Sequence, residues 1–369
     1  MDRRNFLKSS AGIAAAIVPG TAAARAAEGT AAARAAEGTA APSLSKSVQD
    51  VVLSSPWPDH SGGYADQVFG FGQRLERAAD GRLKVHMQTH TGGVHDAVAN
   101  DQAIVHFSLA HEYVALHPAF GFFAGLPGGM GLPFDALERW LIAGGGGTLW
   151  DELSATLGVK MLLAGHTGPS LGLWSARPLT SINDFTGQTI QTGGLADEVV
   201  KSLGGLPARV PSDNLPNALA LALARGDVRA AEWGNAAHCL AAGLAEQVKY
   251  CTATGLNRSG SSLTVTVSQR VWERFGAGLQ TVLTAMAAAD ARRSVAEASA
   301  NSAILCQALG AVKAVQFYAL PRDIAGVSDR VAEAIVADIA ARDRLSARIN
   351  QSYVRAKTAI GGELLFNAV

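Results

Sequence analysis

The histidines and serines of this chain do not form the sets that enzymes use. His111 and His117 flank Glu112 and are six positions apart, whereas a helical zinc site needs histidines at i and i+4 so that both face one metal ion. The sequence has no Gly-x-Ser-x-Gly motif, which would expose a nucleophilic serine on a sharp turn. We therefore predict that the chain is not an enzyme, and we interpret these histidines as loop residues.

The glycine run and the cysteines have simpler interpretations than a phosphate or metal site. Glycines 144–147 lack the Gly-Lys-Ser/Thr that completes a phosphate loop, so the run predicts a turn between two helices. Cys239, Cys251 and Cys306 have no metal-ligand spacing. A disulfide between Cys239 and Cys251 is one interpretation for an oxidising compartment, and two separate buried thiols are the alternative.

Several polar and aromatic residues fall where strands are expected to end, and they favour a binding cleft. Aromatic side chains with a few polar groups line most pockets for small solutes. Periodicity alone would instead place the tryptophans in the core. The candidates are Trp57, Tyr113, Trp174, Gln191, Glu232 and Trp233.

Glu232 differs from the other candidates because it is an acid within the apolar stretch of residues 230–234. If it is buried it needs a partner, since burying an unpaired charge is costly. That partner would be a cation, a metal ion or a polar ligand. An exposed loop carboxylate is the alternative, and the residues alone leave the two open.

The elements that must position these residues alternate between strand and helix patterns. Apolar or alternating runs predict strands at 51–53, 83–87, 103–109, 160–164 and 262–267. Helical spacing of apolar residues predicts helices at 69–79, 135–143, 149–157, 195–203 and 215–224, and longer ones at 280–311 and 329–358. This alternation predicts an α/β fold, in which ligands bind beyond the carboxyl ends of the strands.

The composition is that of a neutral globular protein. The 369 residues are 48% hydrophobic and 17% charged, and 31 Lys and Arg balance 31 Asp and Glu. This balance excludes strong attraction to nucleic acid or to an anionic membrane surface, which needs an excess of clustered cations. At about 150 residues per domain, the length predicts two domains.

Residues 1–45 predict an export signal and a linker rather than a folded element. Arg3 and Arg4 precede a short apolar run at residues 11–18, and alanine-rich cleavage sites follow. The paired arginines favour a twin-arginine signal, with a general secretory signal as the alternative route. Residues 20–28 recur unchanged at 29–37, and this duplicated linker has no large apolar side chain to bury. We therefore expect a periplasmic protein.

From about residue 57 to residue 279 the sequence resembles the solute-binding proteins of tripartite ATP-independent periplasmic (TRAP) transporters. It is most similar to the branch that binds 2-oxo acids and related carboxylates. The resemblance rests on an ordered series of short segments at 80–83, 122–130, 140–146, 149–153, 165–168, 181–187, 193–195, 203–207 and 230–233.

The resemblance implies two α/β lobes that close on a solute held between them. The first lobe would comprise residues 46–168 and about 257–296, and the second residues 169–256 and about 297–328. A C-terminal helical extension at 329–369 would follow, and some members of the branch dimerise through such a helix. A separate membrane permease is the implied partner. A sodium or calcium ion beside the ligand, held through Glu232 and Trp233, is the implied cofactor.

Two positions that hold the ligand or its metal ion in the family depart from the family pattern here. Gln191 stands where the family has an arginine that clamps the ligand carboxylate with a bidentate pair, and Ser170 stands where the oxo-acid branch has a metal-binding glutamine. Three outcomes are open: the solute is neutral or cationic, another arginine holds its carboxylate, or binding is lost. The arginines considered are Arg177, Arg209 and Arg258.

The sequence thus predicts the solute-binding subunit of a TRAP transporter, which captures a small polar solute. A periplasmic enzyme, or a scaffold protein that has lost transport, is the alternative. The residues predicted to hold the solute are Gln191, Glu232, Trp233, Ser170, Trp57, Tyr113 and Trp174.

Overall fold

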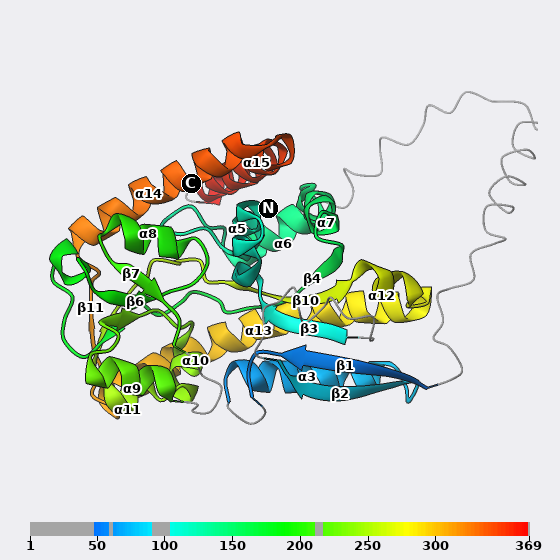
Figure 1. Cartoon of the computed structure of the whole chain (residues 1–369), viewed down its shortest axis with the longest axis horizontal. Coiled ribbons are helices and arrows are strands. Elements are labelled where there is room, and N and C mark those ends of the chain that lie inside the picture. The colour runs from blue at the N-terminus through cyan, green and yellow to red at the C-terminus, as the bar shows by residue number, and fades with distance from the viewer. Residues whose placement is uncertain (1–47, 59–61, 91–103, 211–216, 368–369) are drawn as a thin grey trace, which may run out of the picture. The chain divides into compact units, whose positions relative to one another are not determined.

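The structure is a computed structural model of the chain, and it describes residues 48–58, 62–90, 104–210 and 217–367 (Figure 1). Side chains are described as far as residue 359. The export signal and linker predicted for residues 1–45 lie outside the described residues. Among the helices of the described part, none is both long enough and apolar enough to cross a membrane.

The first sheet has five strands in the order β2 (Leu83–Thr89), β1 (Gln49–Ser55), β3 (Ile104–Leu109), β10 (Ser262–Ser268) and β4 (Val159–His166). β1 is parallel to β2 and β3, and β10 is antiparallel to β3 and β4. Apolar side chains of α3 (Tyr64–Ala78) and α13 (Ala277–Ala311) pack into one core with this sheet. Those of α6 (Phe134–Ile142) and α7 (Gly146–Ala155) pack with β4 into another. This sheet and its helices are the first lobe.

The second sheet has six short strands in the order β11 (Gln316–Tyr318), β9 (Tyr250–Thr252), β5 (Trp174–Ser175), β8 (Ala230–Ala231), β6 (Thr189–Gln191) and β7 (Leu206–Ala208). Two further cores flank it. One includes α9 (Ala218–Arg225), α10 (Ala236–Ala241) and α11 (Leu244–Gln247), and the other includes α8 (Ala196–Ser202). This sheet and these helices are the second lobe.

The α/β architecture is confirmed, and the strands missed in the sequence are the short ones. Each of the five strands predicted from periodicity belongs to the first sheet. The strands of the second sheet have two or three residues each, which is too short for a period of two to show. Strands of the two sheets come from the ranges predicted for the two lobes, and the lobe boundaries themselves stay predictions.

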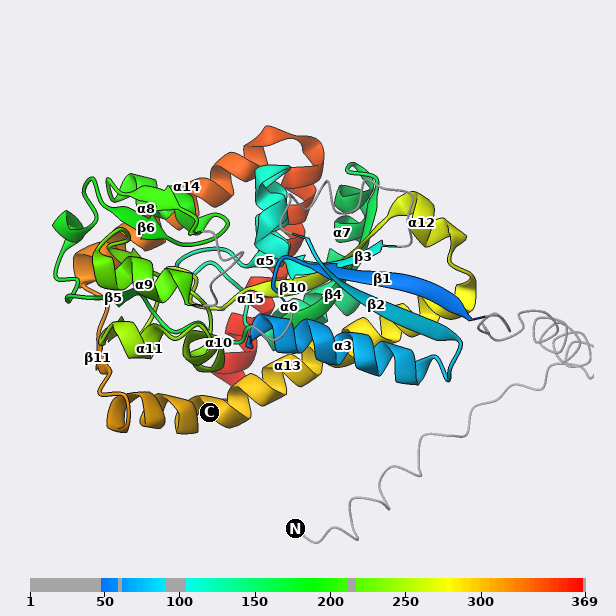
Figure 2. The same ribbon diagram turned by 60° about the horizontal axis from the view of Figure 1, so that its bottom comes forward.

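One long helix belongs to both lobes. α13 has 35 residues. Leu279, Leu283 and Ala287 pack into the core of the first lobe, whereas Leu309 packs into a core of the second. Figure 2 shows the helix running along the molecule from α12 (Gln269–Arg274) toward β11.

The C-terminal residues form two helices instead of the single one predicted at 329–358. α14 (Arg322–Arg342) ends before Asp343, and α15 (Arg344–Asn367) follows it. The Asp343 carboxylate accepts hydrogen bonds from the backbone N–H and the hydroxyl of Ser346, so it caps the new helix. Ile324 lies in a core of the second lobe, whereas Tyr353 lies in a core of the first. The C-terminal segment is therefore part of both cores rather than an appendage.

The predicted glycine turn is confirmed, and the disulfide is not formed. Gly145 lies between α6 and α7 with a φ of 82°, and a Cβ on Gly146 would lie 2.6 Å from the Trp140 ring. Glycine is therefore required for the close approach of the two helices. Cys239 and Cys251 are separate buried thiols, as the alternative interpretation held.

Candidate functional site

A cavity of about 930 Å³ lies between the two lobes, where strands of both sheets end. Leu109 ends β3, Thr167 follows β4, Gln191 ends β6 and Glu232 follows β8, and all four line the cavity. Carboxyl ends of strands are the usual place for ligands in α/β folds. The cavity is also within the size range of small-molecule sites, roughly 300 to 1,000 Å³.

Five of the seven predicted site residues line this cavity, namely Trp57, Ser170, Gln191, Glu232 and Trp233. They come from both lobes, so the fold brings together residues that are far apart in the sequence.

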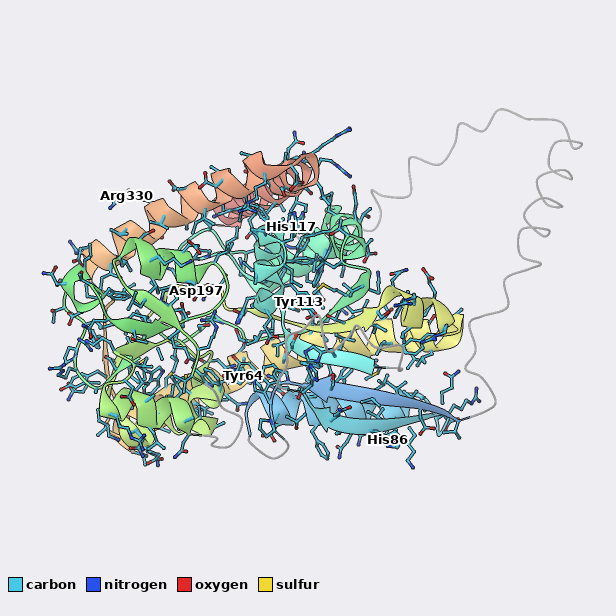
Figure 3. The ribbon with its side chains drawn as sticks, in the orientation of Figure 1. Tyr64, His86, Tyr113, His117, Asp197 and Arg330 are labelled. Carbon is cyan, nitrogen blue, oxygen red and sulfur yellow. The ribbon has the colours of Figure 1, made fainter. Side chains whose placement is uncertain are left out.

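Tyr113 and Trp174 do not line the cavity, which corrects their assignment to the site. Tyr113 is 1% exposed and packs against Phe120 in a core of the first lobe, with ring centroids 5.6 Å apart. It lies on the 3₁₀ helix η1 (Ala110–Ala115), and Figure 3 labels it there. The residues of η1 that line the cavity include His111 and Glu112 instead. Trp174 is fully buried in the core formed with α9, α10 and α11. For Trp174 the core alternative offered for the tryptophans is the right one.

Glu232 is buried, and its partners are backbone amides. Its carboxylate accepts hydrogen bonds from Leu256 N at 2.9 Å and from Asn257 N at 3.0 Å. Burial raises the pKa of Glu232 to about 7, while these two hydrogen bonds oppose the rise. A Cβ on Gly255 would lie 2.5 Å from Glu232 Oε1, so glycine there makes room for the carboxylate. The exposed alternative is wrong, and the chain itself supplies the partner.

Tyr64 is a cavity residue that the sequence interpretation missed. Its hydroxyl donates a hydrogen bond to the Trp233 carbonyl at 2.9 Å, which joins the first lobe to the second. The Tyr64 ring stacks between Trp57 and His238, with centroid distances of 4.8 and 3.9 Å. Figure 3 labels Tyr64 at the start of α3, beside the second lobe. Only long-range contacts reveal this role, because the residue is one of several aromatics in an amphipathic helix.

Gln191 does not act as a free substitute for the clamping arginine. Its Oε1 accepts a hydrogen bond from Val210 N at 2.8 Å, so the side chain holds the segment that follows β7. Of the three arginines considered as alternatives, Arg209 is the one found among the residues that line the cavity. It forms an ion pair with Asp197, with Nη2 and Oδ2 2.6 Å apart.

His111 and Glu112 form a second missed part of the wall. Burial lowers the pKa of His111 to about 4 and raises the pKa of Glu112 to about 7. Gly193 and Gly194 of the second lobe lie directly against His111: a Cβ on Gly193 would lie 2.6 Å from His111 Cε1, and one on Gly194 would lie 2.8 Å from His111 Cβ. The paired glycines therefore let the second lobe approach this imidazole closely, and they were the signal available in the sequence.

Residues 130–343, more than half of the chain, match the model of the bacterial extracellular solute-binding proteins, family 7. The chain belongs to this family. The resemblance seen in the sequence is therefore confirmed.

One relative is a monocarboxylate 2-oxoacid-binding periplasmic protein from a Nostoc species, which is 26% identical over 232 residues. The match covers 60% of this chain and 61% of that protein, so the family 7 chain spans less than two thirds of its relative.

Two solved structures share the two-lobed fold. A TRAP periplasmic solute-binding protein from Pseudoalteromonas atlantica, with bound sodium and pyruvate, has a TM-score of 0.77 at 22% identity, covering 86% of this chain and 97% of that one. A TRAP transporter solute-binding protein from Bordetella bronchiseptica, with calcium and picolinate, has a TM-score of 0.79 at 21% identity, covering 88% and 96%.

The two residues predicted to bind a metal ion, Glu232 and Trp233, offer the oxygen ligands that a hard cation prefers. The Glu232 carboxylate and the Trp233 carbonyl both lie at the cavity wall and offer oxygen atoms, which sodium and calcium prefer. Each group accepts hydrogen bonds within the protein but keeps a further lone pair. Ser170 also lines the cavity, but its side chain is shorter than the glutamine of the oxo-acid branch. In the described part of the chain, no three His, Cys, Asp or Glu side chains cluster as a metal site.

Proposed function

We propose that this chain is the extracytoplasmic solute-binding subunit of a TRAP transporter. The observation that carries the proposal is the cavity at the strand ends of both lobes in a family 7 chain. A solute in this cavity would contact both lobes at once, so binding would favour the closed arrangement over the open one.

The lining residues suit a small polar solute. Trp57 and Trp233 offer flat apolar surfaces, and Ser170 and Asn257 offer neutral hydrogen-bonding groups. The closed protein would then deliver the solute to a membrane permease. We place this step in the periplasm, reached through a twin-arginine signal that contains Arg3 and Arg4.

A sodium or calcium ion would be held by the Glu232 carboxylate and the Trp233 carbonyl. Such an ion would supply positive charge to a polar group of the solute. Independently of any ion, Glu232 positions the 256–257 segment through its two backbone hydrogen bonds. Tyr64 fixes the Trp233 carbonyl.

We also propose that α15 provides a homodimer contact. Val354 is 45% exposed on this helix, although the inner face of the helix is committed to the first lobe. Light scattering of the purified protein would show a dimer, and Val354→Glu would weaken it. A monomer at all concentrations would contradict this contact but not solute binding.

The test of the proposed function is to identify the solute. Mass spectrometry of the solute released from purified, denatured protein should find a small polar metabolite, and adding it back should raise the melting temperature by mass action. Small-angle scattering should then show a smaller radius of gyration. An unchanged scattering profile at saturation would contradict closure, and the absence of any stabilising solute would contradict the function.

A further inference from the structure

Two of the basic residues that line the cavity, Arg209 and Lys201, are already paired within the second lobe. Arg209 donates to both carboxylate oxygens of Asp197, at 2.6 and 3.3 Å, and to the Ala208 carbonyl at 2.9 Å. Lys201 forms an ion pair with Glu198 at 2.6 Å. A solute carboxylate would have to compete with these carboxylates for its partner. The Arg209 pair is the stronger obstacle, because its two parallel hydrogen bonds fix the guanidinium.

The other charged residues on the same side of the cavity do not provide a free buried cation for a solute carboxylate. Asp338 and Arg342 both line the cavity, but they are exposed on α14, one helical turn apart. Their opposite charges lie where water screens them. Gln191, at the place of the clamp, offers only neutral hydrogen bonds.

Glu112 in the first lobe is in the opposite situation. It lines the cavity and is partly buried, yet no ion pair of Glu112 is found among the described residues. The adjacent imidazole of His111 is neutral near pH 7, because burial lowers its pKa to about 4. Burial also raises the pKa of Glu112 to about 7, although the nearby Arg209 guanidinium and a backbone hydrogen bond at Leu109 oppose the rise. Arg209 is itself paired with Asp197, so the Glu112 carboxylate has no cation of its own within the described residues.

We propose that the solute carries a protonated amine and that Glu112 binds it. This inference rests on the proposed solute-binding function and names the chemical class of the solute. An ammonium group would donate charge-assisted hydrogen bonds to the Glu112 carboxylate, which are roughly twice as strong as neutral ones. A bare carboxylate would be repelled by Glu112, and the Arg209 guanidinium nearby is already paired with Asp197.

The first test compares matched sets of small probes on the full chain. Each set contains a short ω-amino alcohol, the diol of the same length and the hydroxy acid of the same length. In thermal-shift measurements at neutral pH, the amino alcohol should raise the melting temperature most and the hydroxy acid least. Equal or greater stabilisation by the hydroxy acid would overturn the amine assignment while leaving solute binding intact.

Substitutions locate the effect at Glu112. Glu112→Gln keeps the shape of the side chain and should lower the affinity for the amino alcohol about tenfold or more in calorimetry. The matched control is Asp227→Asn, which removes the same charge from an exposed residue that does not line the cavity, and it should change the affinity by less than about twofold. Equal losses in the two variants would overturn the assignment.

A third variant tests the ion pair between Asp197 and Arg209 in the second lobe. Asp197→Asn removes the partner of Arg209, so the freed guanidinium should raise the affinity for the hydroxy acid about tenfold. An unchanged preference would overturn the view that this pair excludes carboxylates.

The failure of this inference and the failure of the proposed function give different results. If no probe binds, the solute released from denatured protein decides: an amine upholds the inference, and a solute without one overturns it. If no probe binds and no solute is released, the proposed function fails and the inference fails with it.

Discussion

Two of the carboxyl groups that line the cavity, Glu112 in the first lobe and Glu232 in the second, have a pKa that burial raises to about 7. Their surroundings differ. Glu232 accepts hydrogen bonds from two backbone N–H groups that are 24 and 25 positions away in the chain. The ionised form of Glu112 is favoured only by a backbone hydrogen bond at Leu109, in its own segment, and by Arg209, which is already paired with Asp197. The comparison teaches that a raised pKa alone does not identify a binding residue. The partners separate a carboxylate that holds the fold from one that is available to a solute.

The largest expected effect is the loss of the structural carboxylate. Glu232→Ala leaves the N–H groups of Leu256 and Asn257 without an acceptor, so we expect it to lower the free energy of unfolding by about 2 to 4 kcal/mol. Urea unfolding measures this value. The control is Glu112→Ala, for which we expect less than about 1 kcal/mol. Similar losses of unfolding free energy in the two variants would show that Glu232 does not stabilise the fold more than Glu112 does.

The pH dependence of stability sharpens the comparison at Glu112. Its pKa is raised from 4.5 to about 7 in the folded protein, so its contribution to stability is complete below pH 4.5 and is lost as the pH rises through 7. The stability of the wild type relative to Glu112→Gln should therefore fall over this window, by up to about 3 kcal/mol. Urea unfolding at a series of pH values would test this. A difference that stays flat would contradict the raised pKa.

A third prediction concerns the contact between Gly193 of the second lobe and His111, the neighbour of Glu112 in the first lobe. In Gly193→Ala, the new Cβ would lie 2.6 Å from the His111 ring, so closure should cost about 2 kcal/mol of overpacking and solute affinity should fall. Calorimetry with the identified solute measures the loss. The double variant with His111→Ala should recover most of it. If the second change brings no recovery, the two residues do not meet on closure.

The smallest effect is expected at the altered clamp. Gln191→Arg would place a cation at the end of β6 and should strengthen the binding of pyruvate about tenfold, measured by calorimetry. The change also removes the acceptor for Val210 N, which limits the gain. The double variant with Ser170→Gln restores both family residues and should bind pyruvate better still. If the wild type already binds pyruvate tightly and the arginine weakens binding, another residue holds the carboxylate.

The sequence was a good guide to elements with a long periodic pattern and to the family, but a poorer guide to which side chains face the cavity. The first sheet and the long α13 follow from hydrophobic spacing. The role of Tyr64 could not be read in this way, because its hydroxyl meets the Trp233 carbonyl across 169 positions of the chain. The partners of Glu232 are likewise 24 and 25 positions away.

Aromatic residues were misplaced for a related reason. Tyr113 and Trp174 are predicted to line the cavity because they fall where strands are expected to end, yet each side chain turns into a core. In a 3₁₀ helix of six residues or a strand of two residues, the direction of one side chain depends on the neighbouring layers. Those layers come from remote parts of the chain, so local spacing does not determine the outcome.

The continuity of α13 has a mechanical consequence. Its 35 residues span about 52 Å at 1.5 Å per residue, and its central part is fixed to the first lobe by Arg74 on Asp290 and by the His166 N–H on Ser294. The helix contains no proline, the residue that most often causes a sharp kink, so a bend would be shared among many residues. A bend of about 10° at the middle would move either tip by about 4 to 5 Å. Small strains shared among many residues of the helix would therefore add up to a displacement of several ångströms between its two ends, which are packed in the cores of different lobes.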